Sequence, residues 1–186
     1  MYGRVDEKNS IIKMITEAKS DGVTVIPIVG IGGIGKTALA QFVYNDPVVK
    51  SLFEDKMIWV WLSNNFDEEQ LTREMLDVVC QKKQEGSCNF SKLQEILKSH
   101  MKQTRYLLVL DDVWDDMNNY RLNKLLAPFN SNNAEGNVII MTTGIWSVAK
   151  RIGTVKPIEL GALEKEDSWM LFKQCAFGDE NHELCG

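Results

Sequence analysis

The residues with the clearest chemistry form one octapeptide, Gly-Ile-Gly-Gly-Ile-Gly-Lys-Thr, at positions 30–37. Glycines let successive backbone N–H groups turn inward around an anion, and the start of a following helix adds partial positive charge at the same point. The amine of Lys36 would reach the β- and γ-phosphates of a nucleotide, and the hydroxyl of Thr37 would ligate Mg²⁺. The pattern predicts a nucleoside diphosphate or triphosphate site formed by Gly30, Ile31, Gly32, Gly33, Ile34, Gly35, Lys36, Thr37 and Ala38.

Two acidic residues could complete such a site. Asp111 and Asp112 directly follow an apolar run at 107–110, which reads as a buried strand. An acid at this position holds Mg²⁺ through water, and we assign that role to Asp111. Asp112 could orient or deprotonate the attacking water, which makes it the candidate catalytic residue. The alternative is that two acids after a strand simply cap a turn.

The glycines at 30, 32 and 35 also satisfy the G-x-G-x-x-G pattern of dinucleotide-binding proteins. That pattern needs an acid at the end of the next strand to hold the ribose hydroxyls. Here the next strand-like run, 57–62, is followed by Ser-Asn-Asn, and the first carboxylate is Asp67. The Lys-Thr pair would also be unexplained, so we reject the dinucleotide interpretation.

Composition excludes several classes of function. A chain of 186 residues with 44% hydrophobic and 25% charged residues predicts one ordinary globular domain. The net charge of −5 gives no general attraction to nucleic acid or anionic lipid, so we expect neither as a partner. No apolar run approaches the ~20 residues that span a membrane. The four cysteines and two histidines suggest neither a zinc site nor a disulfide framework, so we expect reduced thiols and a cytoplasmic location.

Strand-like and helix-like segments alternate, which predicts a three-layer α/β sandwich with a mostly parallel sheet and helices on both faces. We expect five strands, at 23–29, 57–62, 106–110, 137–143 and 156–160. We expect helices at 36–44, from the cap Asp67 onward, at 91–101, 120–126 and 145–151, and finally over 163–177. Ser91 to Gln94 resembles a capping box, and Pro128 should lie beyond the end of its helix.

Taken together, these motifs resemble the NB-ARC nucleotide-binding domain of plant intracellular immune receptors, relatives of the apoptosome ATPases. The octapeptide is similar to the family's P-loop, and Leu-Leu-Val-Leu-Asp-Asp-Val-Trp at 107–114 is similar to its Walker B segment. Residues 53–62 resemble the block after the first helix of the family, and residues 160–177 resemble the opening of its helical subdomain. Tyr2-Gly3-Arg4 looks like the short N-terminal segment that contacts adenine.

The resemblance implies a P-loop NTPase fold with a nucleotide-binding domain at 1–160 and the beginning of a helical subdomain at 161–186. It implies that Arg4 and Val5 join the nucleotide contacts and that ADP, ATP and Mg²⁺ are the ligands. The implied function is a switch in pathogen defence, ADP-bound at rest and at most a slow ATPase. Trp114 looks like the coiled-coil branch of these receptors. The implied partners are the coiled-coil and leucine-rich-repeat domains of a full receptor, together with self-association on activation.

The chain departs from the family pattern in two respects. The paired threonines of the family are usually followed by an arginine that senses the γ-phosphate, whereas Thr142-Thr143 is followed by Gly144. The alternative for Gly144 is a backbone turn with positive φ. The family's later Gly-Leu-Pro-Leu and Met-His-Asp segments are also missing, so we expect a fragment or a truncated product. A turnover ATPase or kinase and a degenerate scaffold remain the alternative functions.

Overall fold

The computed structural model describes residues 3–18, 22–54, 56–62, 66–81, 88–114, 119–130 and 134–177. The expected contributions of Tyr2, of the segment after residue 62 and of the tail after residue 177 lie outside these residues. The described helices are α1 (Val5–Thr16), α2 (Lys36–Tyr44), α3 (Pro47–Phe53), α4 (Glu68–Cys80), α5 (Phe90–Met101), α6 (Asn119–Asn130), α7 (Trp146–Ile152) and α8 (Lys165–Phe177). The described strands are β1 (Val23–Val29), β2 (Met57–Trp61), β3 (Leu107–Asp111), β4 (Asn137–Thr143) and β5 (Ile158–Glu159).

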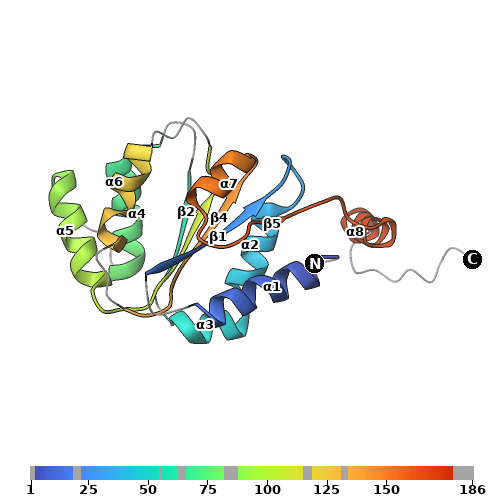
Figure 1. The fold of residues 1–186 in the computed structure, drawn as a ribbon, viewed down its shortest axis with the longest axis horizontal. Coiled ribbons are helices and arrows are strands. Elements are labelled where there is room, and N and C mark those ends of the chain that lie inside the picture. Colours follow the sequence, from blue (N-terminus) through green and yellow to red (C-terminus); the bar gives the residue numbers. More distant parts are fainter. Residues whose placement is uncertain are drawn as a thin grey trace, which may run out of the picture.

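The five strands form one sheet in the order β2-β3-β4-β1-β5, and every strand pairing is parallel. The predicted α/β sandwich is therefore confirmed (Figure 1). Strand β1 lies between β4 and β5, so the loop that leaves β1 is next to the end of β4. Because all strands are parallel, the residues that follow β1, β3 and β4 meet at the carboxyl edge of the sheet.

Helices cover both faces of the sheet, and the strand side chains alternate between two cores. On β3, Leu107 and Val109 pack toward the core that contains α1, α2 and α3. Leu108 and Leu110 pack toward the opposite core, which α4, α5 and α6 cover together with Val148 of α7. This alternation follows from the twofold period of a strand, and burial on both faces explains why the strand is apolar throughout.

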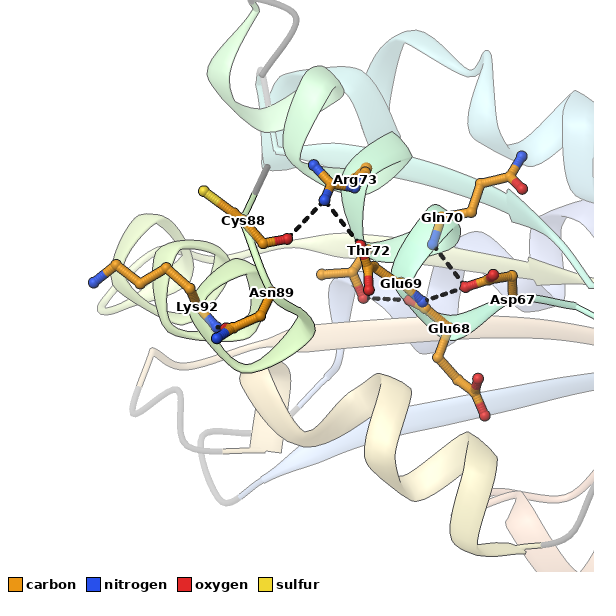
Figure 2. A network of polar contacts seen from close by, with 9 residues as sticks. All are labelled: Asp67, Glu68, Glu69, Gln70, Thr72, Arg73, Cys88, Asn89 and Lys92. Carbon is orange, nitrogen blue, oxygen red and sulfur yellow. Dashed lines mark hydrogen bonds and ion pairs between the residues drawn. The ribbon is translucent and has the colours of Figure 1, made fainter. Parts of the chain in front are cut away.

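Side-chain caps fix where the helices next to the sheet begin (Figure 2). Asp67 accepts hydrogen bonds from the N–H groups of Glu69 (2.8 Å) and Gln70 (3.1 Å), as predicted for the start of α4. The predicted capping box at Ser91 is wrong, because Asn89 is the cap of α5 and accepts from the N–H of Lys92 at 2.9 Å. The cap therefore lies two residues earlier than predicted, and it satisfies the N–H of Lys92 rather than that of Gln94.

The prediction that α6 ends before Pro128 is wrong, since Pro128 lies inside the helix. A proline in this position removes the N–H that would bond to the carbonyl of Lys124, four residues earlier. The side chain of Gln94 on α5 donates a hydrogen bond to that carbonyl instead. A contact between two helices therefore replaces the lost bond, and no local pattern around Pro128 contains this information.

Helix α8 lies apart from the sheet (Figure 1) and contributes no buried side chain. Its large apolar side chains are exposed, and the rings of Trp169 and Phe172 stack with 5.5 Å between their centroids. The N-terminal segment contacts this end of the chain, because a Cβ atom added at Gly3 would lie 2.5 Å from the Asp167 carboxylate. Among the described helices, none is long and apolar enough to cross a membrane.

Candidate functional site

The loop between β1 and α2 adopts a conformation that depends on glycine at two positions. Gly33 has φ of 77° and Gly35 has φ of 99°, both in the left-handed region that residues with a side chain rarely adopt. No heavy atom lies within 4 Å of a Cβ added at either residue or at Gly32. The loop is therefore open to an approaching ligand, and its glycines serve backbone geometry rather than internal packing.

The N-terminus of α2 points its unpaired N–H groups toward this opening. Gly35 is the N-cap residue and provides no side-chain hydrogen bond, so the N–H groups of the first turn remain available to an anion. Lys36 extends back along the loop, and its ammonium donates to the carbonyl of Ile31 at 3.0 Å. A cation above a ring of backbone donors is the arrangement that binds phosphate oxygens.

Thr37 and Asp111 meet across the sheet edge, as expected for two halves of a metal site. The hydroxyl of Thr37 donates to Oδ1 of Asp111 at 2.9 Å. Since the single hydroxyl proton points to the carboxylate, the lone pairs of Thr37 Oγ1 are free to ligate Mg²⁺. Asp111 is buried, with 4% of its surface exposed, so its carboxylate is held in this place by the protein.

Asp112 follows with a backbone conformation that is unusual for a non-glycine residue. Its φ of 66° is left-handed, a region that Asp tolerates better than most residues but still at a cost. The N–H of Asp112 donates to Thr142 Oγ1 at 2.9 Å, and Thr142 Oγ1 donates to Asp111 Oδ1 at 2.6 Å. The end of β4 therefore holds the turn that carries both acids.

A cavity of about 460 Å³ adjoins Lys36, Thr37 and Asp112, whereas Asp111 is not among the residues that line it. It is lined by Gly32, Gly33, Gly35, Lys36, Thr37, Ala38, Gln41, Trp61 and Asp112. Seven of these residues were predicted from the sequence; Gln41 and Trp61 were missed. Gln41 follows Thr37 by one helical turn and could have been found from that spacing, whereas the pairing of Trp61 with Asp111 is visible only in the sheet.

The other predicted nucleotide contacts lie outside the cavity lining. Gly30 is packed at the end of β1, where an added Cβ would lie 2.9 Å from the carbonyl oxygen of Leu160. Ile31 is exposed, and Ile34 is half-buried. Arg4 is buried and donates to the carbonyls of Gly161 (2.6 Å) and Ile34 (3.4 Å), which places it behind the loop.

Val5 is 56% exposed in the first turn of α1, adjacent to Arg4.

Among the described residues, no group of three or more His, Cys, Asp and Glu side chains could hold a metal ion by itself. Mg²⁺ in P-loop sites needs no such group, because it keeps several water ligands and takes one or two from the protein. Thr37 and Asp111 fit that ligand set, and the loop fits the phosphates.

Gly144 lies directly after β4, beside the loop. Its φ is not positive, so the alternative of a left-handed turn is wrong. A Cβ atom added at Gly144 would meet only the carbonyl oxygen of Gly30, at 3.8 Å, which is an ordinary contact. The position can therefore accept a side chain, and that side chain would start next to the phosphate-binding loop.

Comparison with protein families and curated proteins gives one consistent result. The family model described as NB-ARC domain matches residues 4–182. Disease resistance protein RGA2 of Solanum bulbocastanum is 38% identical over 182 residues, which cover 97% of this chain and 18% of that protein. Disease resistance RPP13-like protein 4 of Arabidopsis thaliana is 32% identical over 186 residues, covering 95% and 20%. The chain therefore spans at most about a fifth of the length of these relatives.

Solved structures with similar folds are more distant in sequence. Cdc6p from Pyrobaculum aerophilum matches with a TM-score of 0.65 and 13% identity, covering 91% of this chain and 48% of that one. A signal transduction ATPase with numerous domains (STAND), which carries a tetratricopeptide repeat sensor and comes from Pyrococcus horikoshii, matches with a TM-score of 0.55 and 20% identity. That alignment covers 90% of this chain and 25% of the other. These likenesses show an α/β P-loop fold.

Proposed function

The chain belongs to the NB-ARC domain family, and from this membership and the cavity geometry we propose that it is the nucleotide-dependent switch domain of a plant intracellular immune receptor. In this proposal ADP occupies the cavity at rest, and exchange for ATP accompanies activation. Slow Mg²⁺-dependent hydrolysis would return the domain to its resting state, so the chain is at most a slow ATPase.

The observation that carries the proposal is that Thr37, which lines the cavity beside Lys36, is hydrogen-bonded to an acid at the end of another strand. Lys36 and Thr37 begin α2 directly after the loop, and the Asp111 carboxylate at the end of β3 accepts the Thr37 hydroxyl proton at 2.9 Å. Lys36 would contact the β- and γ-phosphates, with Thr37 directly on Mg²⁺ and Asp111 holding it through water. When bound, Mg²⁺ would neutralise charge on the phosphate oxygens.

The side chains of the chain itself supply positioning rather than covalent chemistry. Asp112 lines the cavity and can accept a hydrogen bond from the water that attacks the γ-phosphate. Within the part of the chain that the structure describes, Lys36 is the one cation that lines the cavity. Few groups therefore stabilise charge in the transition state, which is consistent with slow turnover and with a switch rather than a metabolic enzyme.

We propose that residues 1–160 form the nucleotide-binding domain and that residues 161–186 begin a helical subdomain. The exposed apolar side chains of α8 fit this division, because a helix with no buried residue gains stability from whatever packs against it. Coiled-coil and leucine-rich-repeat domains of a full receptor, a cytoplasmic location and self-association on activation belong to the same proposal.

The nucleotide released on denaturing the freshly purified protein tests the proposal. Stoichiometric ADP would support the switch, and rapid ATP turnover by the native protein would support an ATPase or kinase instead. Absence of nucleotide, together with no binding of added ADP in the presence of Mg²⁺, would support a degenerate scaffold. Lys36→Arg protein purified in parallel is the control, because it should carry less nucleotide if the cavity is the binding site.

A further inference from the structure

We propose that Thr142 is a positioning residue that aligns both acids of the site through a single hydroxyl group. The inference rests on the proposed function, which it deepens. Thr142 is 1% exposed, and its Oγ1 accepts the N–H of Asp112 at 2.9 Å while donating to Asp111 Oδ1 at 2.6 Å. One hydroxyl therefore contacts the proposed metal-binding residue and the proposed catalytic residue at the same time.

The Thr142 hydroxyl helps to fix the orientation of the Asp111 carboxylate. Thr37 and Thr142 each have one hydroxyl proton, and both donate it to the same carboxylate oxygen, Oδ1. Two hydrogen bonds to one oxygen fix the orientation of the carboxylate plane. The other oxygen, Oδ2, would then be the one left to hold Mg²⁺ through water. Without Thr142, the carboxylate could rotate about its bond to Cβ.

The same hydroxyl stabilises the backbone of Asp112 in its left-handed conformation, with φ of 66°. Two further bonds hold this turn on β4: the N–H of Val113 donates to the carbonyl of Thr142 at 2.9 Å, and Thr143 Oγ1 donates to the carbonyl of Val113 at 2.7 Å. Of these bonds from β4, the two made by the Thr142 hydroxyl are the ones that reach Asp111 and Asp112. Its loss leaves the Asp112 N–H without its acceptor, a costly state for a partly buried donor.

Neighbouring Thr143 provides a matched control. It is equally buried, lies on the same strand end and bonds to the same turn, but its hydroxyl contacts Val113 and the N–H of Ile145 rather than either acid. Thr142→Val and Thr143→Val each replace a buried hydroxyl by a methyl group of similar size. A merely structural role would make the two variants alike, whereas a positioning role makes only Thr142→Val change the site.

The experiment compares the wild type with Thr142→Val, Thr142→Ser and Thr143→Val. A fluorescent ADP analogue should bind all four equally in EDTA, because neither Thr142 nor Thr143 is among the residues that line the cavity. In titrations with Mg²⁺, we expect Thr142→Val to need a roughly ten- to a hundredfold higher Mg²⁺ concentration for half-maximal effect on ADP binding. For ATP turnover, Thr142→Val should lower kcat by a larger factor than it changes KM. Thr142→Ser should restore both the Mg²⁺ dependence and kcat. Equal behaviour of Thr142→Val and Thr143→Val would overturn the inference.

A second measurement needs no nucleotide. Amide hydrogen exchange at Asp112 should become faster in Thr142→Val and stay slow in Thr142→Ser and Thr143→Val. Each variant is measured at the same interval below its own melting temperature. Unchanged exchange at Asp112 in Thr142→Val would refute the positioning role, even if nucleotide binds. Faster exchange in a protein that binds no ADP under any condition would retain the positioning role and reject the proposed switch.

Discussion

Replacing Gly144 by arginine should convert this site from one that treats ADP and ATP alike into one that prefers ATP. Gly144 follows β4, and a Cβ atom there would lie 3.8 Å from the carbonyl oxygen of Gly30, the first residue of the loop. The backbone at Gly144 has no positive φ, so a side chain introduces no strain. The arginine side chain would begin beside the loop, at the carboxyl edge of the sheet. The γ-phosphate of a bound ATP would lie at this edge.

The expected gain in ATP affinity comes from adding a positive charge at position 144. Among the described residues that line the cavity, Lys36 is the one cation, and Asp112 adds a negative charge. A charge-assisted hydrogen bond from arginine to a phosphate oxygen is worth about 1.5–3 kcal/mol, which is roughly ten- to a hundredfold in affinity. Only ATP carries the phosphoryl group that accepts this bond, so ADP affinity should change little.

Calorimetric titration of ADP and ATP into the wild type and Gly144→Arg gives the four dissociation constants that this argument needs. We expect similar constants for both nucleotides in the wild type and a selective gain for ATP in the variant. Gly144→Met is the matched control, because it adds length without charge and should give no selectivity. Equal losses for ADP and ATP in Gly144→Arg would show that the side chain disturbs the loop, and would refute the reasoning.

Four further changes test other parts of the structure. Lys36→Arg should lose most ADP affinity while keeping the wild-type circular dichroism spectrum, because a planar guanidinium does not replace a compact ammonium; undiminished affinity in a calorimetric titration would contradict the loop assignment. Asp112→Asn should keep Mg-ADP affinity but lower ATP turnover by roughly 10²–10⁴-fold in a phosphate-release assay, and a parallel loss of binding would count against a catalytic role. Tyr106→Phe should keep or raise the melting temperature, because the buried Tyr106 hydroxyl has no hydrogen-bond partner among the described residues and such groups cost ~1–3 kcal/mol. The Lys8 ammonium, 2.7 Å from Asp46, holds the pKa of that carboxyl below its usual value, so its stabilisation is complete at neutral pH and is lost as the pH falls through the carboxyl range. Asp46→Asn should therefore flatten the acid side of the stability curve in urea denaturation, and an unchanged curve would reject the pair as its cause.

Features encoded in short segments could be predicted from the sequence. The glycine loop, the strand that precedes it and the start of α2 are adjacent in the chain, so one motif specifies their geometry. Asp111 could be assigned because an acid at the end of an apolar strand reaches the carboxyl edge of any parallel sheet. Helix α3 was missed, although Asp46 and Pro47 form a cap and a first helical residue that could have predicted it.

Features that depend on contacts between distant segments could not be predicted in this way. The role of Thr142 requires the register of β3 beside β4 and the turn at Asp112, neither of which is visible in the residues around it. Strand β2 reads as a fully covered strand, but it lies at the edge of the sheet and leaves Trp61 61% exposed. The sheet order decides its exposure, and local apolarity does not encode that order.

The guanidinium of Arg4 connects the phosphate-binding loop to the segment that follows β5, because it donates to the carbonyls of both Ile34 and Gly161. If the segment around Gly161 moved away, its bond to Arg4 would break, whereas the bond to Ile34 would remain. A hydrogen bond from a charged donor is worth about 1.5–3 kcal/mol, so such a displacement would carry a free-energy cost of that order. Because one side chain contacts both segments, a displacement around Gly161 would also change the contacts that support the loop.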